Sequence, residues 1–203
     1  IKKNVEDSLD IFEKEGTYYD LTKWCSSKLN NFTDGHMLLQ AIYDGPESAL
    51  DKALHAYECR YSDQSPDKSL LMSYAEENMD YKVVPTTRYW HGYLVFLRPL
   101  LCFLDYGGLR ILSACSFAIL VIALAIFTYK KLGLAVTFAV LLSFLGASVG
   151  IATQSISTII PFFLAVVASI YLLARYGKIK SFSIYFFIIG ACTCFFDLLT
   201  TPL

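Results

Sequence analysis

Two polar residues near the end of an asparagine-containing loop could do chemistry. Asp34 and His36 stand two positions apart. A carboxylate can serve as a general base or bind a metal ion, and a histidine can hold a phosphate group. We therefore predict that Asp34 is a catalytic base and that His36 binds substrate. The alternatives are a helix cap for Asp34, worth about 1 kcal/mol, and an ordinary hydrogen-bonded or solvated histidine for His36.

A second polar cluster lies in an aromatic segment and contains Arg88, Trp90, His91 and Tyr93. Aromatic faces stack on sugar rings, and a guanidinium group pairs with phosphate oxygens through two hydrogen bonds. This composition predicts a binding site for a sugar phosphate. The same residue types also anchor helices at a membrane surface, where Trp and Tyr are enriched, so a purely anchoring role is the alternative.

Asp197 is the single carboxylate between Leu109 and Leu203. An ionisable side chain in such an apolar stretch is costly to bury and is a functional candidate by default. We predict that Asp197 binds substrate, although its position near the end of the last apolar run lowers the cost of keeping it there.

The first part of the chain must position Asp34 and His36, and its pattern predicts short helices. Apolar residues recur at helical spacing over residues 1–16 and 34–43. Proline in the first turn suits two further helices, over residues 46–57 and 66–79. We expect three or four short helices joined by loops, without strands.

The remainder is apolar enough to enter a membrane. The apolar and aromatic run from Tyr89 to Tyr106 is shorter than the roughly twenty residues that a spanning helix needs, so we predict that residues 88–108 form an interfacial amphipathic segment, with a short kinked span as the alternative. We therefore expect an all-α fold, a polytopic membrane helix bundle with an extracytoplasmic helical region over residues 1–87. Its four spans, each able to cross a hydrocarbon core about 30 Å thick, are predicted at 109–127, 132–151, 156–173 and 182–199.

The basic residues set the expected orientation. Lys130 and Lys131 follow the first predicted span, three more basic residues join the last two spans, and the middle loop carries none. Because positive loops favour the cytoplasmic side, we expect residues 1–108 to be extracytoplasmic in a multi-pass cell-membrane protein. The arginines in and beside the interfacial segment oppose this arrangement, but they can pair with acidic residues or with lipid phosphates.

Composition excludes several functions. Charged residues make up 17% of the chain, and the net charge is -1, so there is no basic field for nucleic acid. Phosphate-loop, dinucleotide-binding, nucleophile-elbow and zinc-protease motifs are absent from the sequence. Cys25 and Cys59 could form a disulfide if this region is exported. The chain begins at Ile1 and ends just after an apolar run, and we expect it to be a fragment.

Three segments carry a family resemblance, and they are Asp34-Gly35-His36-Met37-Leu38-Leu39, Tyr89-Trp90-His91-Gly92-Tyr93-Leu94 and Gly108-Leu109-Arg110-Ile111-Leu112-Ser113-Ala114. In layout, the sequence resembles the polytopic glycosyltransferases of the GT-C superfamily, in which an early acidic motif in an outer loop is followed by a juxtamembrane segment and a run of membrane helices. The Pro-Pro pair of that family is absent, and the acidic motif has one carboxylate instead of two. The chain also resembles a group of clostridial-type membrane proteins with an Arg-Tyr-Trp-His-Gly motif, a likeness that carries no activity with it.

The GT-C resemblance implies a transferase that moves a sugar from a polyprenyl-phosphate carrier to an acceptor at the outer membrane face. Asp34 would activate the acceptor, Arg88 and His91 would hold the donor phosphate, and Trp90 or Tyr93 would stack on the sugar. The expected partners are the lipid bilayer and a polyprenyl-phosphate-linked sugar, and the one cofactor considered is a divalent metal with unknown ligands. The alternative is a transporter or a non-catalytic envelope or binding membrane protein.

Overall fold

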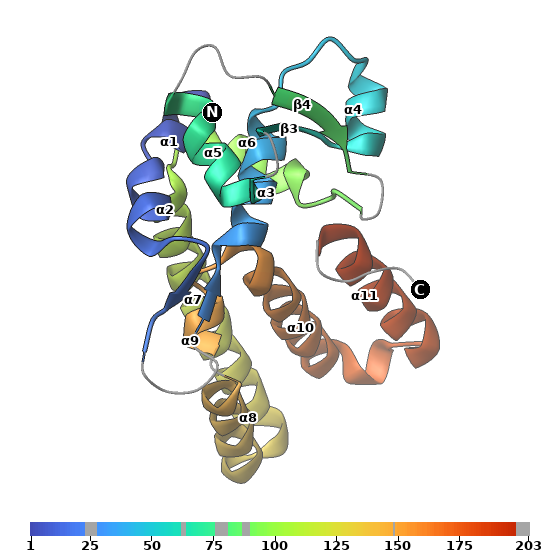
Figure 1. Cartoon of the computed structure of the whole chain (residues 1–203). Helices are drawn as coiled ribbons and strands as arrows, with labels where there is room; N and C mark the ends of the chain where they lie inside the picture. Colours follow the sequence, from blue (N-terminus) through green and yellow to red (C-terminus); the bar gives the residue numbers. More distant parts are fainter. Residues whose placement is uncertain (23–27, 62–63, 76–80, 87–89, 148, 198–203) are drawn as a thin grey trace.

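The computed structural model describes residues 1–22, 28–61, 64–75, 81–86, 90–147 and 149–197. Over these residues the chain is mostly helical, which confirms the helical character of the predicted fold class. Figure 1 shows two parts: a group of short elements from α1 to α6, and helices α7 to α11 that extend away from it.

The first part combines short helices with two antiparallel hairpins. Strand β1 pairs with β2, and β3 pairs with β4. The helices are α1 (Lys2–Glu6), α2 (Leu9–Glu15), α3 (Asn31–Ile42), α4 (Ala49–His55), α5 (Pro66–Ala75) and α6 (Leu94–Leu101), and the strands are β1 (Tyr18–Asp20), β2 (Lys28–Asn30), β3 (Tyr57–Tyr61) and β4 (Tyr81–Pro85).

The strands correct the expectation that this region is built of helices and loops alone. The helix predicted over residues 46–57 ends at His55, because Ala56 adopts a left-handed conformation with φ 40° and Tyr57 begins β3. Strand β4 carries two valines and a tyrosine, which are residue types that favour strands. Residues 57–61 do alternate between apolar and polar types, but the predicted helix already included Tyr57, and the partner strand lies twenty or more positions away.

The helix predicted over residues 1–16 is two helices, α1 and α2, with a break at Asp7 and Ser8. The Ser8 hydroxyl accepts a hydrogen bond from the backbone N–H of Tyr106 at 2.8 Å and donates one to the Asn4 carbonyl at 2.6 Å. A tertiary contact therefore accompanies the break. The predicted stop at Gly16 is confirmed, with φ 68° at that residue.

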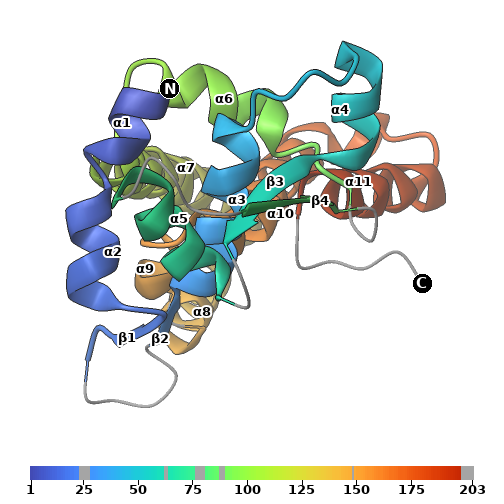
Figure 2. The same cartoon turned by 45° about the horizontal axis from the view of Figure 1, so that its top comes forward.

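Helix α3 is the centre of the first part, packed against α1, α5, α6 and β3, and its first turn reaches α10 (Figure 2). Asn30 caps its N-terminus by accepting a hydrogen bond from the Thr33 N–H at 3.2 Å. Arg98 of α6 lies at its other end and donates to the carbonyl oxygens of Gln40, at 3.0 Å, and Tyr43, at 3.4 Å. The prediction of a helix over residues 34–43 is confirmed, with a start three residues earlier.

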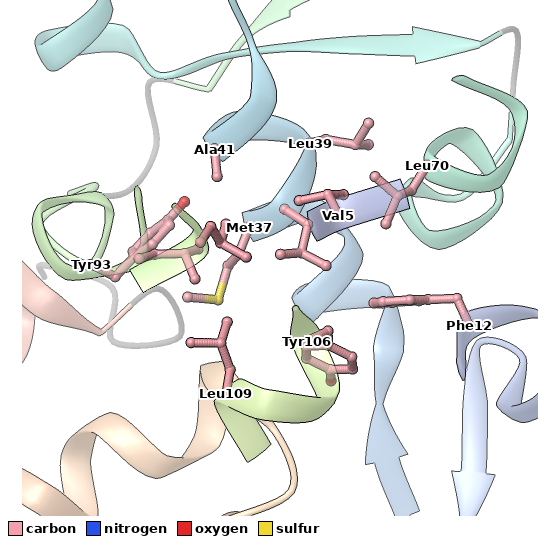
Figure 3. Packing of buried hydrophobic residues seen from close by; sticks show 12 residues of the cluster. Val5, Phe12, Met37, Leu39, Ala41, Leu70, Tyr93, Tyr106 and Leu109 are labelled. Carbon is pink, nitrogen blue, oxygen red and sulfur yellow. The ribbon is translucent and has the colours of Figure 1, made fainter. Parts of the chain in front are cut away.

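One apolar core joins the two parts of the chain (Figure 3). Met37, Leu38 and Leu39 of α3 are buried in it, and Tyr106 and Leu109 at the start of α7 pack into the same cluster. Because α7 begins inside this core, the direction in which it leaves is set by the first part of the chain. The other members are Val5, Phe12, Ala41, Leu70, Tyr93, Leu97 and Leu101.

Among the described residues, two helices are long and apolar enough to cross a membrane, where four were predicted. They are α7 (Tyr106–Leu132) and α10 (Ile156–Arg175), which continues through the short 3-10 helix η1 (Tyr176–Lys178). The predicted span at 132–151 is divided into α8 (Leu134–Gly146) and α9 (Val149–Ala152), and the span at 182–199 is α11 (Phe182–Phe196).

The lengths of α8 and α11 explain why two of the four predicted spans are not found. Helix α8 has 13 residues and α11 has 15, so at 1.5 Å per residue each reaches only about 20 Å of the roughly 30 Å hydrocarbon thickness. Gly146 ends α8 and Gly150 lies in α9, and glycine is a poor helix former. Helix α6 has eight residues, too few to span; its predicted position at a membrane surface stays a prediction.

Candidate functional site

Asp34 is fully buried and ties α3 to the beginning of α10. Its Oδ1 accepts hydrogen bonds from the Ser155 hydroxyl and from the Ser157 N–H, both at 2.9 Å. Its Oδ2 accepts one from the Ile156 N–H at 3.0 Å and a close one from the Tyr106 hydroxyl. Asp34 therefore caps a helix, but the helix is α10 and not its own.

The position of Asp34 at the N-terminus of α10 matters for its two predicted roles, catalytic base and helix cap. A carboxylate at a helix N-terminus meets free N–H groups and the positive end of the helix dipole, which stabilises the charged form. Each oxygen of Asp34 already has two donors from within the chain. Its role as a catalytic base stays a prediction, and the bonding observed is that of a structural joint.

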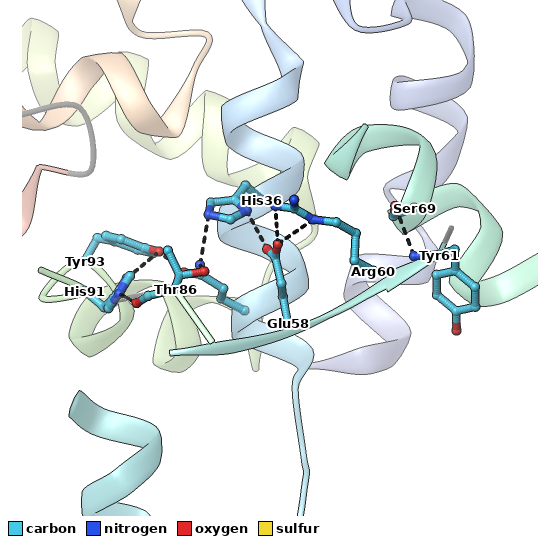
Figure 4. A network of polar contacts seen from close by, with 9 residues as sticks. His36, Glu58, Arg60, Tyr61, Ser69, Thr86, His91 and Tyr93 are labelled. Atoms are coloured by element: carbon cyan, nitrogen blue, oxygen red, sulfur yellow. Dashed lines mark hydrogen bonds and ion pairs between the residues drawn. The ribbon is translucent and has the colours of Figure 1, made fainter. Parts of the chain in front are cut away.

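The other face of α3 meets a different polar group, most of which Figure 4 labels. We name it the His36 cluster, and it consists of His36, Gln40, Glu58, Thr86, His91 and Tyr93. Residues two apart on a helix are rotated by about 200°, so Asp34 and His36 face opposite ways. Two neighbours in sequence that suggested one site therefore belong to two separate groups.

At one end of the cluster, His36 meets the fully buried carboxylate of Glu58. The His36 Nδ1 and Glu58 Oε2 atoms are in close contact, although they are not aligned as a hydrogen bond. Arg60 donates to the other oxygen, Oε1, from Nη2 at 2.6 Å and from Nε at 3.0 Å. The carboxylate thereby lies between a guanidinium group and an imidazole, a suitable arrangement for orienting the ring of His36.

Gln40 connects His36 to the segment around His91. Its amide nitrogen lies 3.1 Å from His36 Nε2 and 3.1 Å from the Thr86 hydroxyl, and its Oε1 accepts from the Tyr93 hydroxyl. His91 Nε2 lies 2.6 Å from the Thr86 carbonyl oxygen, and its Nδ1 lies 3.3 Å from the Tyr93 hydroxyl. Since a carbonyl oxygen can only accept, the His91 proton is on Nε2.

Burial sets the charge state of this end of the cluster. It lowers the pKa of His91 below its ordinary value, and the hydrogen bond to Thr86 only partly opposes the shift. Burial also raises the pKa of the Tyr93 phenol. Both side chains are therefore neutral near pH 7, and the His91 end of the cluster provides hydrogen bonds without charge.

An apolar cleft of about 360 Å³ begins where the His36 cluster ends. Tyr93 belongs to both, because its ring lines the cleft while its hydroxyl binds Gln40. The cleft lies between α6, α7, α10 and the end of α11, and the remaining lining residues are Phe96, Leu97, Leu100, Leu109, Leu112, Ser113, Ser116, Ile156, Ile159, Ile160, Phe163, Leu164 and Phe196.

The segment that precedes α6 is held against the end of α11. The Gly92 N–H donates to the Phe195 carbonyl at 3.0 Å, and the half-exposed ring of Trp90 lies 6.0 Å from that of Phe195. Asp197 is buried directly after α11, two residues from this contact. The predicted ligand Arg88 lies outside the described residues.

Of the predicted site residues, the structure thus brings His36, His91 and Tyr93 into one cluster, while Asp34 lies apart from them. Sequence reasoning missed Gln40, although it lies four positions after His36 on a predicted helix, where side chains meet. It also missed Glu58, which comes from a strand that was not expected.

The divalent metal that was considered as a cofactor finds no ready set of ligands in the part of the chain that is described. No group of three or more His, Cys, Asp or Glu side chains comes together there. Cys59 carries a free thiol, and its proposed disulfide partner Cys25 lies outside the described residues.

Comparison of the sequence and the fold with protein-family models, curated proteins and solved structures gives no match.

Proposed function

We propose that this chain is a membrane-integral glycosyltransferase that moves a sugar from a polyprenyl-phosphate donor to an acceptor at the outer membrane face. In this proposal, α7 and α10 cross the bilayer, and the first part of the chain lies outside the cytoplasm. The observation that carries the proposal is the position of Tyr93, whose hydroxyl binds within the His36 cluster while its ring lines the apolar cleft.

A lipid-linked sugar needs both kinds of surface. Its isoprenoid chain needs an apolar groove that continues into the bilayer, and the cleft between α6, α7 and α10 supports this need. Its polar head needs hydrogen-bond donors and acceptors at the end of that groove. His36, Gln40 and His91 lie there, and the half-exposed ring of Trp90 is available nearby for stacking on a sugar.

We assign the proton transfer to His36. Glu58 orients its ring, and a base oriented by a second group is the usual arrangement for activating a nucleophile. The acceptor hydroxyl displaces the Gln40 amide from His36 Nε2 and gives its proton to that nitrogen. Its oxygen then bonds to the anomeric carbon, while the bond to the phosphate oxygen breaks and polyprenyl phosphate leaves with the electron pair.

A second candidate is a lipid-binding or transport protein without catalysis. It is favoured by Asp34, the residue that the family resemblance assigns as the base, because both oxygens of its carboxylate accept hydrogen bonds from elsewhere in the chain. The same cleft and cluster would hold the lipid and its head group in that case.

A transfer assay on the full chain distinguishes the two candidates. The liposomes contain undecaprenyl-phosphate-linked glucose or mannose, with the radiolabel in the sugar. We expect His36→Asn to abolish transfer while photo-crosslinking of the lipid is retained. The matched control is His55→Asn, since His55 also pairs with a carboxylate, Asp51 at 2.7 Å, but on the surface.

Transfer that survives in His36→Asn would remove His36 from the mechanism. Crosslinking to the lipid without transfer in the unmodified chain, with either sugar, would favour the non-catalytic candidate. Absence of both would overturn the proposed function.

A further inference from the structure

The hairpin of β3 and β4 presents a second face that the His36 cluster does not use. Side chains along a strand alternate between its two faces. Glu58 and Arg60 point to the cluster, so Cys59 and Tyr61 point the other way. The register pairs Cys59 with Val83 and Tyr61 with Tyr81, so these four side chains share one surface.

That surface forms one wall of a hollow of about 350 Å³. The loop after α3, with Tyr43 and Asp44, forms the opposite wall. Such a volume lies in the range of about 300–1,000 Å³ common for small-molecule sites. The remaining lining residues are Lys2, Leu39, Ile42, Gly45, Pro46 and Ser73.

Three tyrosines give the hollow aromatic walls at different angles. The rings of Tyr61 and Tyr81 have centroids 5.8 Å apart and planes inclined by 49°, so their faces are not stacked on each other. The ring of Tyr43 is held by its hydroxyl, which lies 2.8 Å from both carboxylate oxygens of Glu47. Tyr81 is more than half exposed, so its ring is accessible at the rim.

The charges that line the hollow balance. Lys2 and Asp44 provide one charge of each sign, and the Cys59 thiol stays neutral because burial raises its pKa. Lys2 would repel a cationic ligand, and Asp44 would repel an anionic ligand. Polar groups between aromatic faces instead suit a neutral ligand with apolar ring faces and many hydroxyl groups.

We propose that this hollow is a binding site for a neutral saccharide, with the Tyr81 ring stacked on a pyranose face and Asp44 accepting hydrogen bonds from sugar hydroxyls. The site lies across the hairpin from the His36 cluster, so it stands or falls independently of the proposed transfer reaction.

Cys59 in the wall of the hollow allows a direct test. The full chain, in lipid nanodiscs prepared without glycosidic detergent, is treated with N-ethylmaleimide in the presence of maltose or chitobiose. The alkylation rate of Cys59 is measured by mass spectrometry of its peptide. At a sugar concentration about ten times the dissociation constant, about a tenth of the sites stay open, so the rate should fall about tenfold.

The exposed thiol of Cys102 is the internal control and should react at an unchanged rate. Tyr81→Ala and Asp44→Asn should each remove the protection, and Tyr18→Ala, an exposed tyrosine on β1, should not. Two variants at different walls guard against a single one that fails to fold. Equal alkylation of Cys59 with and without either sugar, or protection that persists in both variants, would overturn the proposal.

Discussion

Asp34 and Ser157 are 123 positions apart in the chain, and the backbone N–H of Ser157 donates a hydrogen bond to Asp34 Oδ1 at 2.9 Å. This contact joins the centre of the first part of the chain to the first turn of α10. Asp34, which the sequence predicted to be a catalytic base, therefore has a structural role.

The substitution Asp34→Asn tests the structural role. An amide nitrogen cannot accept, so at least one buried donor loses its partner, and hydrogen bonds to a charged group are worth about 1.5–3 kcal/mol each. We expect the unfolding midpoint in detergent to fall by several degrees, whereas Asp10→Asn, on the exposed face of α2, should leave it unchanged. A variant as stable as the unmodified chain would show that the joint contributes little.

Gly35 lets α3 and α5 approach closely. A Cβ at this position would lie 2.7 Å from the Asp67 Cα and 2.8 Å from the Asp67 backbone nitrogen, neither of which can move alone. Although alanine favours helices, Gly35→Ala should therefore destabilise the chain by about 1–3 kcal/mol. Gly107→Ala is the comparison, since the nearest atom there is a side-chain carbon at 3.4 Å. Equal stability of the two variants would contradict the close approach.

Gly92 holds the segment before α6 against the end of α11. A Cβ at Gly92 would collide with both the ring and the carbonyl oxygen of Phe195. We expect Gly92→Ala to release this contact and so to change the fluorescence of Trp90, whose ring lies 6.0 Å from that of Phe195. The substitution Trp90→Phe identifies which part of the emission belongs to Trp90. An unchanged Trp90 emission in Gly92→Ala would mean that the contact survives.

His91 should make stability depend on pH. Its pKa is lowered by burial, so in mildly acidic solution the unfolded chain binds a proton that the folded chain does not. Stability is complete above the unfolded pKa of about 6.5 and falls as the pH drops below it. The charges that face it are His36, which lowers its pKa further, and Glu58, which raises it.

The measurement for His91 is the unfolding midpoint across this pH range, compared with His91→Gln. Subtracting one pH profile from the other removes the contributions of the other two histidines. The unfolding midpoint of His91→Gln should change less with pH than that of the unmodified chain. Identical profiles for the two proteins would show that His91 does not titrate differently on folding.

The sequence predicted elements whose signals are local and missed the contacts that are not. Pro66 correctly marked the start of α5, Gly16 the end of α2, and two of the four apolar runs became helices long enough to span a membrane. The donors to Asp34 and the partner of His36 come from elements far away in sequence, so no local pattern could identify them. The strand that carries Glu58 was missed although its residues alternate between apolar and polar types, because the helix predicted over residues 46–57 ran into its first residue and its pairing partner is remote.

Helix α3 is fastened at both ends to elements that follow it in the chain. Asp34 binds the first turn of α10, and Arg98 of α6 binds the last carbonyls of α3. A rigid rod held in this way transmits displacement along its length instead of absorbing it. A tilt of α3 imposed from the hairpin side would consequently pull on the N-terminal turn of α10 and move that wall of the apolar cleft.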